Sequence, residues 1–518
     1  MSNKVNEALF DLIQSMTKSE KRYFKLLSSR HSIGGENNYI KLFDAIEKQD
    51  EYDEEELFIQ FKGEALLNRF SITKKRLYDH ILSALDSFHV SNSKEAQLYK
   101  MLHSIDLLYN KSLYDQSSRI LRSAEKLAIK HEKLEILQIL SQKKKKLIET
   151  KGYLQLTDEC IKDQYEKDNS NNNEVILSNE LWSIKSKLFL KLSKKGISRT
   201  ENDVEEYTMI CKKVLDEELQ PSNSIENNYL IYHIRGAYYY AIGQLENSLI
   251  NLEENMKIFE KDQHSVIGVN RKVSIFSNAI YICNRLGHHK KQVDFLAKMK
   301  DISKNSKENE DIEIKLFSSI SSIELNIHLE KGDFEKAYSV AQSIEDKLLQ
   351  FDDKITPIRK AFLSFKIAVV YLGKNDCNAA LKWVNAILND TSLDKTEDIV
   401  GYTQLLDLLI HIELKNDKLL PYSLKNTTRF FKSRNRLYGF ETIFLQFINQ
   451  LIKCDNHFDK ELIWEELNEQ LDGISENTFE SVALDYFDFK SWAVSKLKNK
   501  AFNLVVRDKY NASLRKAP

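Results

Sequence analysis

The sequence of 518 residues carries 76 basic and 77 acidic side chains, which leaves a formal net charge of −1. This balance excludes a global electrostatic field that would attract nucleic acid or anionic lipid, so any such binding must be local. With only 14 glycines and four prolines, and with apolar residues that recur at spacings of three and four, the sequence predicts an all-α fold.

Residues 1–95 are predicted to form a short N-terminal helical domain, because their amphipathic stretches do not follow the period found further along the chain. One stretch, TKSEKRYF, contains Thr17 and Glu20 at the spacing of a capping box, which predicts a helix start. The last stretch, SITKKRLYDHILSALDSF, predicts a helix whose apolar face is formed by Ile72, Leu77, Ile81, Leu85 and Phe88.

Three basic residues, Lys74, Lys75 and Arg76, lie near the start of this last helix. A helix, a turn and a second helix that opens with basic residues is one arrangement by which proteins read DNA, so these residues are candidates for contact with nucleic acid. The intervening stretch KGEALLNR is longer than the turn expected of such a motif. An ordinary solvated helix face is therefore the alternative interpretation.

The stretch LEKGDFEKAYSVAQSIED, further along the chain, has the features of two helices joined by a tight turn. Gly332 can adopt the left-handed conformation that ends one helix, and Asp333 can cap the next. The small and apolar residues that follow lie three or four apart and form one helix face, made of Phe334, Ala337, Ala341 and Ile344.

The same frame recurs along the sequence with a period of 40 to 47 residues. We predict turns at positions 112, 152, 196, 243, 287, 332, 375 and 416. In the stretch YHIRGAYYYAIGQLENSLINLEENM, Gly236 lies seven residues before the turn and Ser248 lies five after it. The period predicts a stack of helical hairpins, each of which buries its apolar face against its neighbours.

This pattern resembles the tetratricopeptide repeat (TPR), which has a small and an aromatic residue before a Gly-Asp turn and a small residue five positions after it. The resemblance covers roughly residues 96–435 and implies a right-handed α-solenoid whose first helices line a concave inner wall. The chain departs from the family where Leu325 and His328 replace the small and the aromatic residue, and its period exceeds the usual length of about 34 residues. HEAT-like or other long helical hairpins are the alternative.

The resemblance also implies which side chains face the inner wall, because the family uses positions ten, six and three or two residues before each turn. These positions hold His233, Ala237, Tyr240 and Ala241, then Ser277, Tyr281, Asn284 and Arg285, then Ser322, Asn326, Leu329 and Glu330, and finally Phe365, Val369 and Leu372. The candidate partner-binding residues are His233, Tyr240, Tyr281, Asn284, Arg285 and Asn326. The family's clamp for a peptide carboxylate is not predicted, because only Asn326 and Arg285 of its residue types are present. The alternative role of the tyrosines is to seal adjacent hairpins.

Residues 436–518 lose the spacing of the turns. They are predicted to form a C-terminal helical cap, because the terminal unit of a repeat array needs a polar outer face. Helices are expected around residues 440–452, 460–471 and 478–497.

Motifs for catalysis and cofactor binding are missing from the sequence. The patterns HExxH, GxxxxGK[ST], GxGxxG and GxSxG do not occur, and the five cysteines form no CxxC pair. We expect no cofactor, no metal site and no enzymatic activity. No apolar run is long enough to span a membrane, and the start MSNKVNEALFDLIQSM lacks the order of a signal peptide, so we expect a cytoplasmic protein without membrane contact.

These observations favour a non-catalytic cytoplasmic adaptor or scaffold that binds a peptide or a helix of a partner protein on its inner wall. The alternative is a regulator whose N-terminal helical domain binds nucleic acid while the repeats sense a peptide or a protein. An enzyme of unknown type is the third hypothesis.

Overall fold

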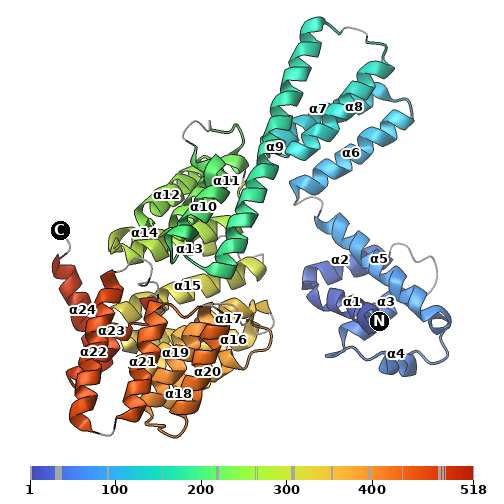
Figure 1. Ribbon diagram of the computed structural model, residues 1–518. Helices are drawn as coiled ribbons and strands as arrows, with labels where there is room; N and C mark the ends of the chain where they lie inside the picture. Colours follow the sequence, from blue (N-terminus) through green and yellow to red (C-terminus); the bar gives the residue numbers. More distant parts are fainter. Residues whose placement is uncertain are drawn as a thin grey trace. The chain divides into compact units, whose positions relative to one another are not determined.

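The computed structural model describes residues 3–29, 38–89, 93–153, 156–216, 221–262, 264, 266–304, 310–351, 354–394, 398–434, 436–454, 456–476, 480, 483–484 and 486–516 (Figure 1). Every regular element in these ranges is a helix, which confirms the predicted all-α fold. None of the described helices combines the length and apolar character needed to cross a bilayer. The chain divides into two compact units, Met1–Asn173 (unit 1) and Glu174–Pro518 (unit 2), which are described separately. The domain boundaries after residues 95 and 435 stay predictions.

Unit 1 begins with a group of short helices around one apolar core. These are α1 (Asn3–Ser15), α2 (Lys18–Ser29), α3 (Asn38–Glu47), α4 (Glu54–Gln60), a 3-10 helix (Ala65–Arg69) and α5 (Phe70–His89). Helix α5 packs against α1, α2 and α3. The shared core contains Ile13, Phe24, Phe43, Leu77 and Ile81.

The capping box at the start of α2 is confirmed, and the predicted burial of Ile72 is wrong. The backbone N of Thr17 donates to Glu20 Oε2 over 2.7 Å, and the backbone N of Glu20 donates to Thr17 Oγ1 over 3.3 Å. Ile72 is 49% exposed. The buried face of α5 includes Phe70 and Leu77, at a spacing of seven residues, and Ile72 lies off this face.

The rest of unit 1 consists of α6 (Lys94–Asn110), α7 (Tyr114–Lys130), α8 (Leu134–Thr150) and the first part of α9 (Asp158–Lys195). Helix α9 is a single helix of 38 residues, where the repeat pattern predicts two helices of consecutive hairpins. This part of the pattern is wrong for a local reason. The sequence of α9 contains no glycine or proline, so no residue in it favours a helix end.

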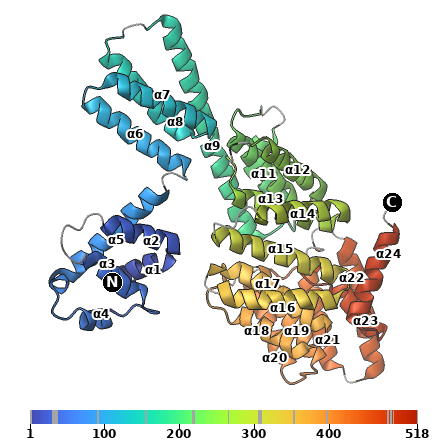
Figure 2. The ribbon, with the colours of Figure 1, turned by 180° about the vertical axis from the view of Figure 1, so that it is seen from behind.

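Unit 2 contains the end of α9 and the helices that follow it. Their bounds are α10 (Glu201–Leu215), α11 (Ile225–Ala241), α12 (Leu245–Lys261), α13 (Val269–Arg285), α14 (His289–Lys304), α15 (Glu310–Glu330), α16 (Phe334–Phe351), α17 (Pro357–Gly373), α18 (Cys377–Leu388), α19 (Asp398–Glu413), α20 (Leu420–Ser433), α21 (Gly439–Lys453), α22 (His457–Glu476), α23 (Phe489–Leu497) and α24 (Phe502–Lys516). Consecutive helices pack against each other, and α15 also contacts both α13 and α17. Figures 1 and 2 show α15 lying between these two helices.

Most of the predicted turns contain a residue with positive φ. The angle lies between 60° and 78° at seven of the eight predicted positions, namely Ser112, Gly152, Gly196, Gly243, Gly287, Gly332 and Asn375, which confirms them. At the eighth turn the positive φ belongs to Lys415, so the prediction of Asn416 is wrong by one residue. At all of these turns except that of Gly196 a Schellman hydrogen bond ends the helix, as where the backbone N of Asp333 donates to the carbonyl of His328 over 2.9 Å.

One hydrogen bond between paired helices recurs at the same place in two hairpins. Ser248 Oγ donates to the carbonyl of Gly236 over 2.8 Å, and Ser117 Oγ donates to the carbonyl of Ile105 over 3.0 Å. Each serine lies five residues after its turn, and each carbonyl lies seven residues before it. The small serine five residues after the turn therefore lets the two helices of each hairpin approach closely.

The C-terminal part of unit 2 is helical but differs in detail from the prediction. Helices α21 to α24 pack in sequence order, and their core contains Phe444, Phe489 and Trp492. The helix predicted over residues 478–497 begins only at Phe489, where Asp488 Oδ1 accepts from the backbone N of Ser491 over 3.0 Å. Residues 478, 479, 481, 482 and 485 of that predicted helix lie outside the described part of the chain.

Helix α24 packs against the turn between α15 and α16. A Cβ atom built on Gly332 would lie 2.7 Å from both the backbone N of Arg507 and the backbone O of Asn503. Arg507 Nη2 also donates to the carbonyl of Gly332 over 3.3 Å. Glycine is therefore required here for its positive φ and for the close approach of α24.

Replacing Gly332 with alanine is expected to loosen α24. A non-glycine residue in the left-handed conformation costs roughly 1–2 kcal/mol, and the added methyl group also forces the backbone of α24 to move. Gly287→Ala is the matched control, because φ is 73° there and no atom lies within 4 Å of the added Cβ. We expect a lower melting temperature and faster amide exchange in α24 for Gly332→Ala than for Gly287→Ala. Equal effects of the two changes would contradict this contact.

Candidate functional site

Unit 2 contains a cavity of about 530 Å³ that is lined by a succession of helices. Its wall includes Phe189 of α9, His233 of α11, Tyr281 of α13, Asn326 of α15, Phe362 of α17 and Tyr402 of α19. A smaller cavity of about 230 Å³ adjoins it, because Tyr281, Ser322, Asn326 and Phe362 line both. Volumes in the hundreds of cubic ångströms are typical of sites for small ligands or short peptide segments.

Four of the six candidate partner-binding residues line the larger cavity, namely His233, Tyr240, Tyr281 and Asn326. Asn284 lines the smaller cavity, and Arg285 lines neither. Asn284 uses its amide within the protein, because it donates to Glu330 and accepts from Gln292 Nε2 over 3.1 Å. The structure thus brings most of the candidates to one place, and their role in binding stays a prediction.

The expected row of inner-wall residues does not continue on α17. Phe365, Val369 and Leu372 are buried in the apolar core that α17 shares with α19, where they pack with residues such as Tyr402 and Leu405. The residues of α17 that line the two cavities are instead Arg359, Phe362, Leu363 and Lys366. Contact between α17 and α19 covers the face that the repeat frame assigns to the wall.

The tyrosines of the wall also connect neighbouring hairpins. The rings of Tyr240 on α11 and Tyr281 on α13 meet edge to face, with their centroids 6.0 Å apart. Both side chains also line the larger cavity. The ring contact agrees with the alternative role of sealing adjacent hairpins, and contact of these tyrosines with a peptide stays a prediction.

His233 is held between two aromatic rings in the wall of the larger cavity. Its imidazole stacks on Phe189 and on Tyr229, with centroid separations of 5.5 Å in both cases. Burial, with the nearby charges of Lys185 and Arg271, lowers the pKa of His233 to about 4, so the ring is neutral at physiological pH. Its Nδ1 atom is buried without a hydrogen-bond partner in the described part of the chain.

Several uncharged polar side chains of the wall make no hydrogen bond within the described residues. These are Asn278 on α13 and Ser322 and Asn326 on α15. An asparagine amide offers two donors and an acceptor, and a serine hydroxyl offers both functions. The wall therefore carries hydrogen-bonding capacity that a bound molecule can use.

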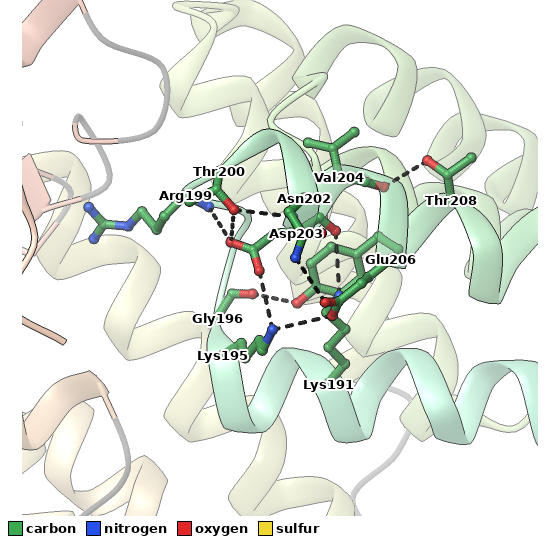
Figure 3. Close-up of polar contacts among 11 residues, drawn as sticks. Lys191, Lys195, Gly196, Arg199, Thr200, Asn202, Asp203, Val204, Glu206 and Thr208 are labelled. Carbon is green, nitrogen blue, oxygen red and sulfur yellow. Dashed lines mark hydrogen bonds and ion pairs between the residues drawn. The ribbon is translucent and has the colours of Figure 1, made fainter. Parts of the chain in front are cut away.

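The segment between α9 and α10 is fixed by a cluster of polar contacts (Figure 3). Lys191 and Lys195 form ion pairs with Glu206, and these charges lower the pKa of Glu206 to about 2. Thr200 Oγ1 accepts from the backbone N of Asp203 over 3.2 Å at the start of α10. Figure 3 shows the side chain of Arg199 extending away from this cluster.

Arg199 reaches a distant part of the chain, and its side chain is only 9% exposed. Nη1 lies 3.2 Å from Glu480 Oε2, and Nη2 donates to the hydroxyl of Tyr402 over 3.3 Å. The guanidinium also lies over the ring of Tyr438, with 4.7 Å to the centroid. Glu480 in turn accepts from the backbone N of Phe440 over 3.0 Å, at the start of α21.

A second arginine strengthens the same connection. Arg436 forms an ion pair with Asp398 and donates from Nη2 to the carbonyl of Lys194 over 2.7 Å. We call the contacts of Arg199 and Arg436 with Lys194, Asp398 and Glu480 the clasp. The clasp borders the larger cavity, because Arg199, Asp398 and Arg436 all line it.

Glu441 lies buried beside the clasp. Burial raises the pKa of Glu441 to about 7, although the positive charge of Arg199 acts in the opposite direction. Its Oε2 atom has no hydrogen-bond partner among the described residues. The ionised form of this carboxyl is therefore costly in the folded protein.

The three basic residues of the N-terminal domain differ in their surroundings. Lys74 is buried, and its Nζ lies 2.9 Å from Glu54 Oε1 and 3.2 Å from the hydroxyl of Tyr52. Lys75 and Arg76 are exposed. Contact of these residues with nucleic acid stays a prediction, and Lys74 can take part only if it leaves its internal partners.

Among the residues that the structure describes, no group of three or more His, Cys, Asp or Glu side chains is placed to hold a metal ion. Burial raises the pKa of Cys211 to about 12 and that of Cys283 to about 11, so both are protonated thiols at neutral pH. The larger cavity instead offers aromatic faces, amides, hydroxyls and cations.

Sequence reasoning missed the charged residues of the wall. The sequence pattern that could have identified Arg359, Phe362 and Lys366 is their spacing of three and four residues, which places them on one face of α17. No local signal marked Arg199, because its partner Glu480 lies 281 residues away in the sequence.

Comparison of the sequence with models of known protein families finds no match, and comparison with curated protein sequences finds no significant match.

Proposed function

We propose that the chain is a non-catalytic cytoplasmic adaptor that binds a segment of a partner protein on the inner wall of a TPR-like, right-handed α-solenoid. Three features support the repeat architecture: the recurring left-handed turns, the Schellman bonds that end the first helices, and the Ser117 and Ser248 bonds at one repeat position. The contacts of α15 with α13 and α17 agree with first helices stacked side by side.

One observation carries the proposed binding role. Residues chosen from the repeat frame alone, on three different helices, line a single cavity: His233 and Tyr240, then Tyr281, then Asn326. The same wall holds hydrogen-bonding groups without partners among the described residues, such as Asn278 and Ser322. Aromatic anchors beside open polar groups are what a preformed recognition groove needs.

The polar groups of the wall favour a short extended segment over a helix as the bound form, because a helix satisfies most of its backbone groups internally. An extended chain is narrower and presents its backbone groups for pairing with the wall. We therefore take an extended peptide as the bound form.

This proposal is tested by selecting peptides from a random displayed library on the full-length chain and measuring their affinity by fluorescence anisotropy. The double change Tyr281→Ala and Asn326→Ala is expected to weaken binding by roughly tenfold or more, because loss of central anchors typically costs over 1 kcal/mol. The matched control is Tyr422→Ala, which removes an exposed ring of α20 that lines neither cavity. Selected peptides that bind the double variant as tightly as the control would contradict the proposal.

A further inference from the structure

Helices α20 and α21 border a groove of about 990 Å³ in unit 2. It shares no lining residue with the two cavities of the inner wall. Leu445 of α21 lines it and is buried in an apolar core. Leu424, Leu437 and Ile452 also line it, are partly buried, and pack against the same core. These apolar side chains form the floor of the groove, where another molecule can bury apolar surface.

Four basic side chains line this groove, and its described lining residues include no carboxylate. They are Lys425, Arg429 and Lys432 of α20 and Lys453 of α21. All four are exposed, and none of their charged groups forms a hydrogen bond or an ion pair with any residue that the structure describes. A ligand with negative charge is therefore favoured over a neutral or a basic one.

A second basic cluster of the chain shows how this groove differs from an ordinary solvated helix face. In the basic run at residues 143–146 of α8, Lys143 pairs with Asp106 and Lys145 pairs with Asp168. These pairs compensate the charge of the helix within the protein. The groove has no such compensation among its described lining residues, so its charge can attract another molecule.

The cations of α20 are spaced like side chains on one face of a helix. Lys425, Arg429 and Lys432 follow each other at spacings of four and three residues. The Cα atoms of Lys425 and Lys432 are separated by about 10 Å along the helix axis, since each residue rises about 1.5 Å. A second helix that lies along α20 has the same rise, so acidic residues at spacings of four and three can each meet one cation.

The polar lining of the groove suits a bound helix better than an extended segment. The hydroxyls of Thr428, Ser433 and Thr442 each donate to a backbone carbonyl three or four residues earlier, so these donors are already in use. The amides of Gln446 and Asn449 remain, but an extended backbone presents unpaired donors and acceptors along its whole length. A helix satisfies most of its backbone groups internally and needs no such partners.

Nucleic acid suits the groove less well than a helix does. Single strands bind by stacking their bases on aromatic side chains, and no aromatic side chain is among the described residues that line the groove. The apolar floor also offers no hydrogen bond to a phosphate or a sugar, the groups that most protein contacts with nucleic acid use. The groove therefore favours a ligand that combines acidic with apolar side chains.

From this charge, floor and spacing we propose that the groove between α20 and α21 binds an amphipathic helix of a partner protein. The helix carries an apolar stripe and, along one edge of it, acidic residues at spacings of four and three. The stripe covers the floor around Leu424 and Leu445, and the acidic residues pair with the cations of α20. This surface is separate from the inner wall, so the inference does not rest on the proposed function. With both surfaces the chain can hold two partner segments at once.

The probe is a fluorescein-labelled peptide with blocked ends and three copies of the unit Glu-Leu-Ala-Ala-Glu-Leu-Ala, titrated with the full-length chain at low ionic strength. As a helix it carries the proposed acidic edge beside a leucine stripe. We expect saturable binding that weakens with added salt, because part of it comes from charge pairs. A peptide with glutamine in place of every glutamate should bind roughly tenfold more weakly or worse, since a hydrogen bond to a charged group is stronger than a neutral one. A peptide with alanine in place of every leucine should also bind more weakly, because it cannot cover the floor.

Changes in the groove provide the second readout. Lys425→Gln and Lys432→Gln should each lower the affinity for the acidic peptide and leave that for the glutamine peptide nearly unchanged. Both residues are exposed, so the helical circular dichroism should not change. The matched control is Lys382→Gln, which removes the same charge from an exposed lysine of α18 that does not line the groove.

The inference is overturned if the acidic peptide does not bind, if the alanine peptide binds as tightly as the leucine peptide, or if Lys382→Gln acts as strongly as Lys425→Gln. Two further measurements decide between occupants. A labelled oligothymidylate that binds as tightly as the acidic peptide and is displaced by it would assign the groove to nucleic acid. Sedimentation velocity of the chain alone would assign it to a second copy, if dimers form and Lys425→Gln converts them to monomers. Either result would also overturn the inference.

Discussion

Replacing Arg199 with leucine is expected to lower the free energy of unfolding by about 3 kcal/mol. Removing one partner of a buried ion pair typically costs about 3–5 kcal/mol, because the other charge stays buried without compensation. We place the effect at the low end of this range because Glu480 keeps its hydrogen bonds from the backbone N atoms of Gly439 and Phe440. Urea unfolding followed by circular dichroism measures the loss.

The control for this change is Arg429→Leu, at an exposed arginine of α20 that forms no ion pair with any described residue. Arg199→Lys is expected to restore little of the lost stability. A lysine ammonium cannot reach Glu480, Tyr402 and the Tyr438 ring at once as the planar guanidinium does. A loss of less than about 1 kcal/mol for Arg199→Leu, the size expected of an exposed pair, would show that the clasp is not closed in solution.

Replacing Glu441 with glutamine is expected to stabilise the protein at pH 8 by about 3 kcal/mol. The pKa of Glu441 is raised to about 7 in the folded protein, against about 4.3 in an unfolded chain. At a pH between these two pKa values, the Glu441 carboxyl is protonated in the folded protein and ionised in the unfolded chain. The contribution of Glu441 to the free energy of unfolding therefore falls as the pH rises from one pKa to the other. Above pH 7 the full cost of the buried carboxylate is present, and glutamine removes it.

The pH profile of the Glu441→Gln variant provides a second readout. His233 has the opposite effect on stability, because its pKa is lowered to about 4 in the folded protein. As the pH falls below about 6.5, the imidazole of His233 takes up a proton in the unfolded chain while it stays neutral in the folded protein, so stability is lost. With Glu441 replaced, the loss of stability from pH 6.5 toward pH 4 should therefore be steeper than in the unchanged protein. The control is Glu465→Gln, at an exposed glutamate of α22. A variant no more stable than this control at pH 8 would contradict the burial of the ionised Glu441.

The turns could be predicted from the sequence because they depend on local backbone chemistry. Gly243, Gly287 and Gly332 adopt a positive φ that glycine reaches without strain, and asparagine does the same at position 375. The errors also have local causes. At the eighth predicted turn the left-handed residue is Lys415, a type that gives no such signal. Helix α9 continues where the pattern requires a break, because its sequence contains no glycine or proline to end it.

The site could be predicted only in part, because the repeat frame describes each hairpin and not how it packs against other hairpins. It identified Tyr240, Tyr281 and Asn326, whose helices follow each other along the chain. It failed on α17, where packing against α19 buries Phe365 and leaves Arg359 and Lys366 to line the cavities. The clasp joins residues too far apart in sequence for any local pattern to connect them.

The clasp has a consequence for how many hairpins unit 2 can contain. An open repeat array can gain or lose a unit at little cost, because each unit contacts only its neighbours. Here Arg199 and Arg436 contact groups 281 and 242 residues away in the sequence, Glu480 and the carbonyl of Lys194. Inserting or deleting one hairpin between them would move these partners apart and break the contacts of the clasp. The contacts of the clasp therefore fix the number of hairpins between its partners, and this number in turn fixes the width of the larger cavity.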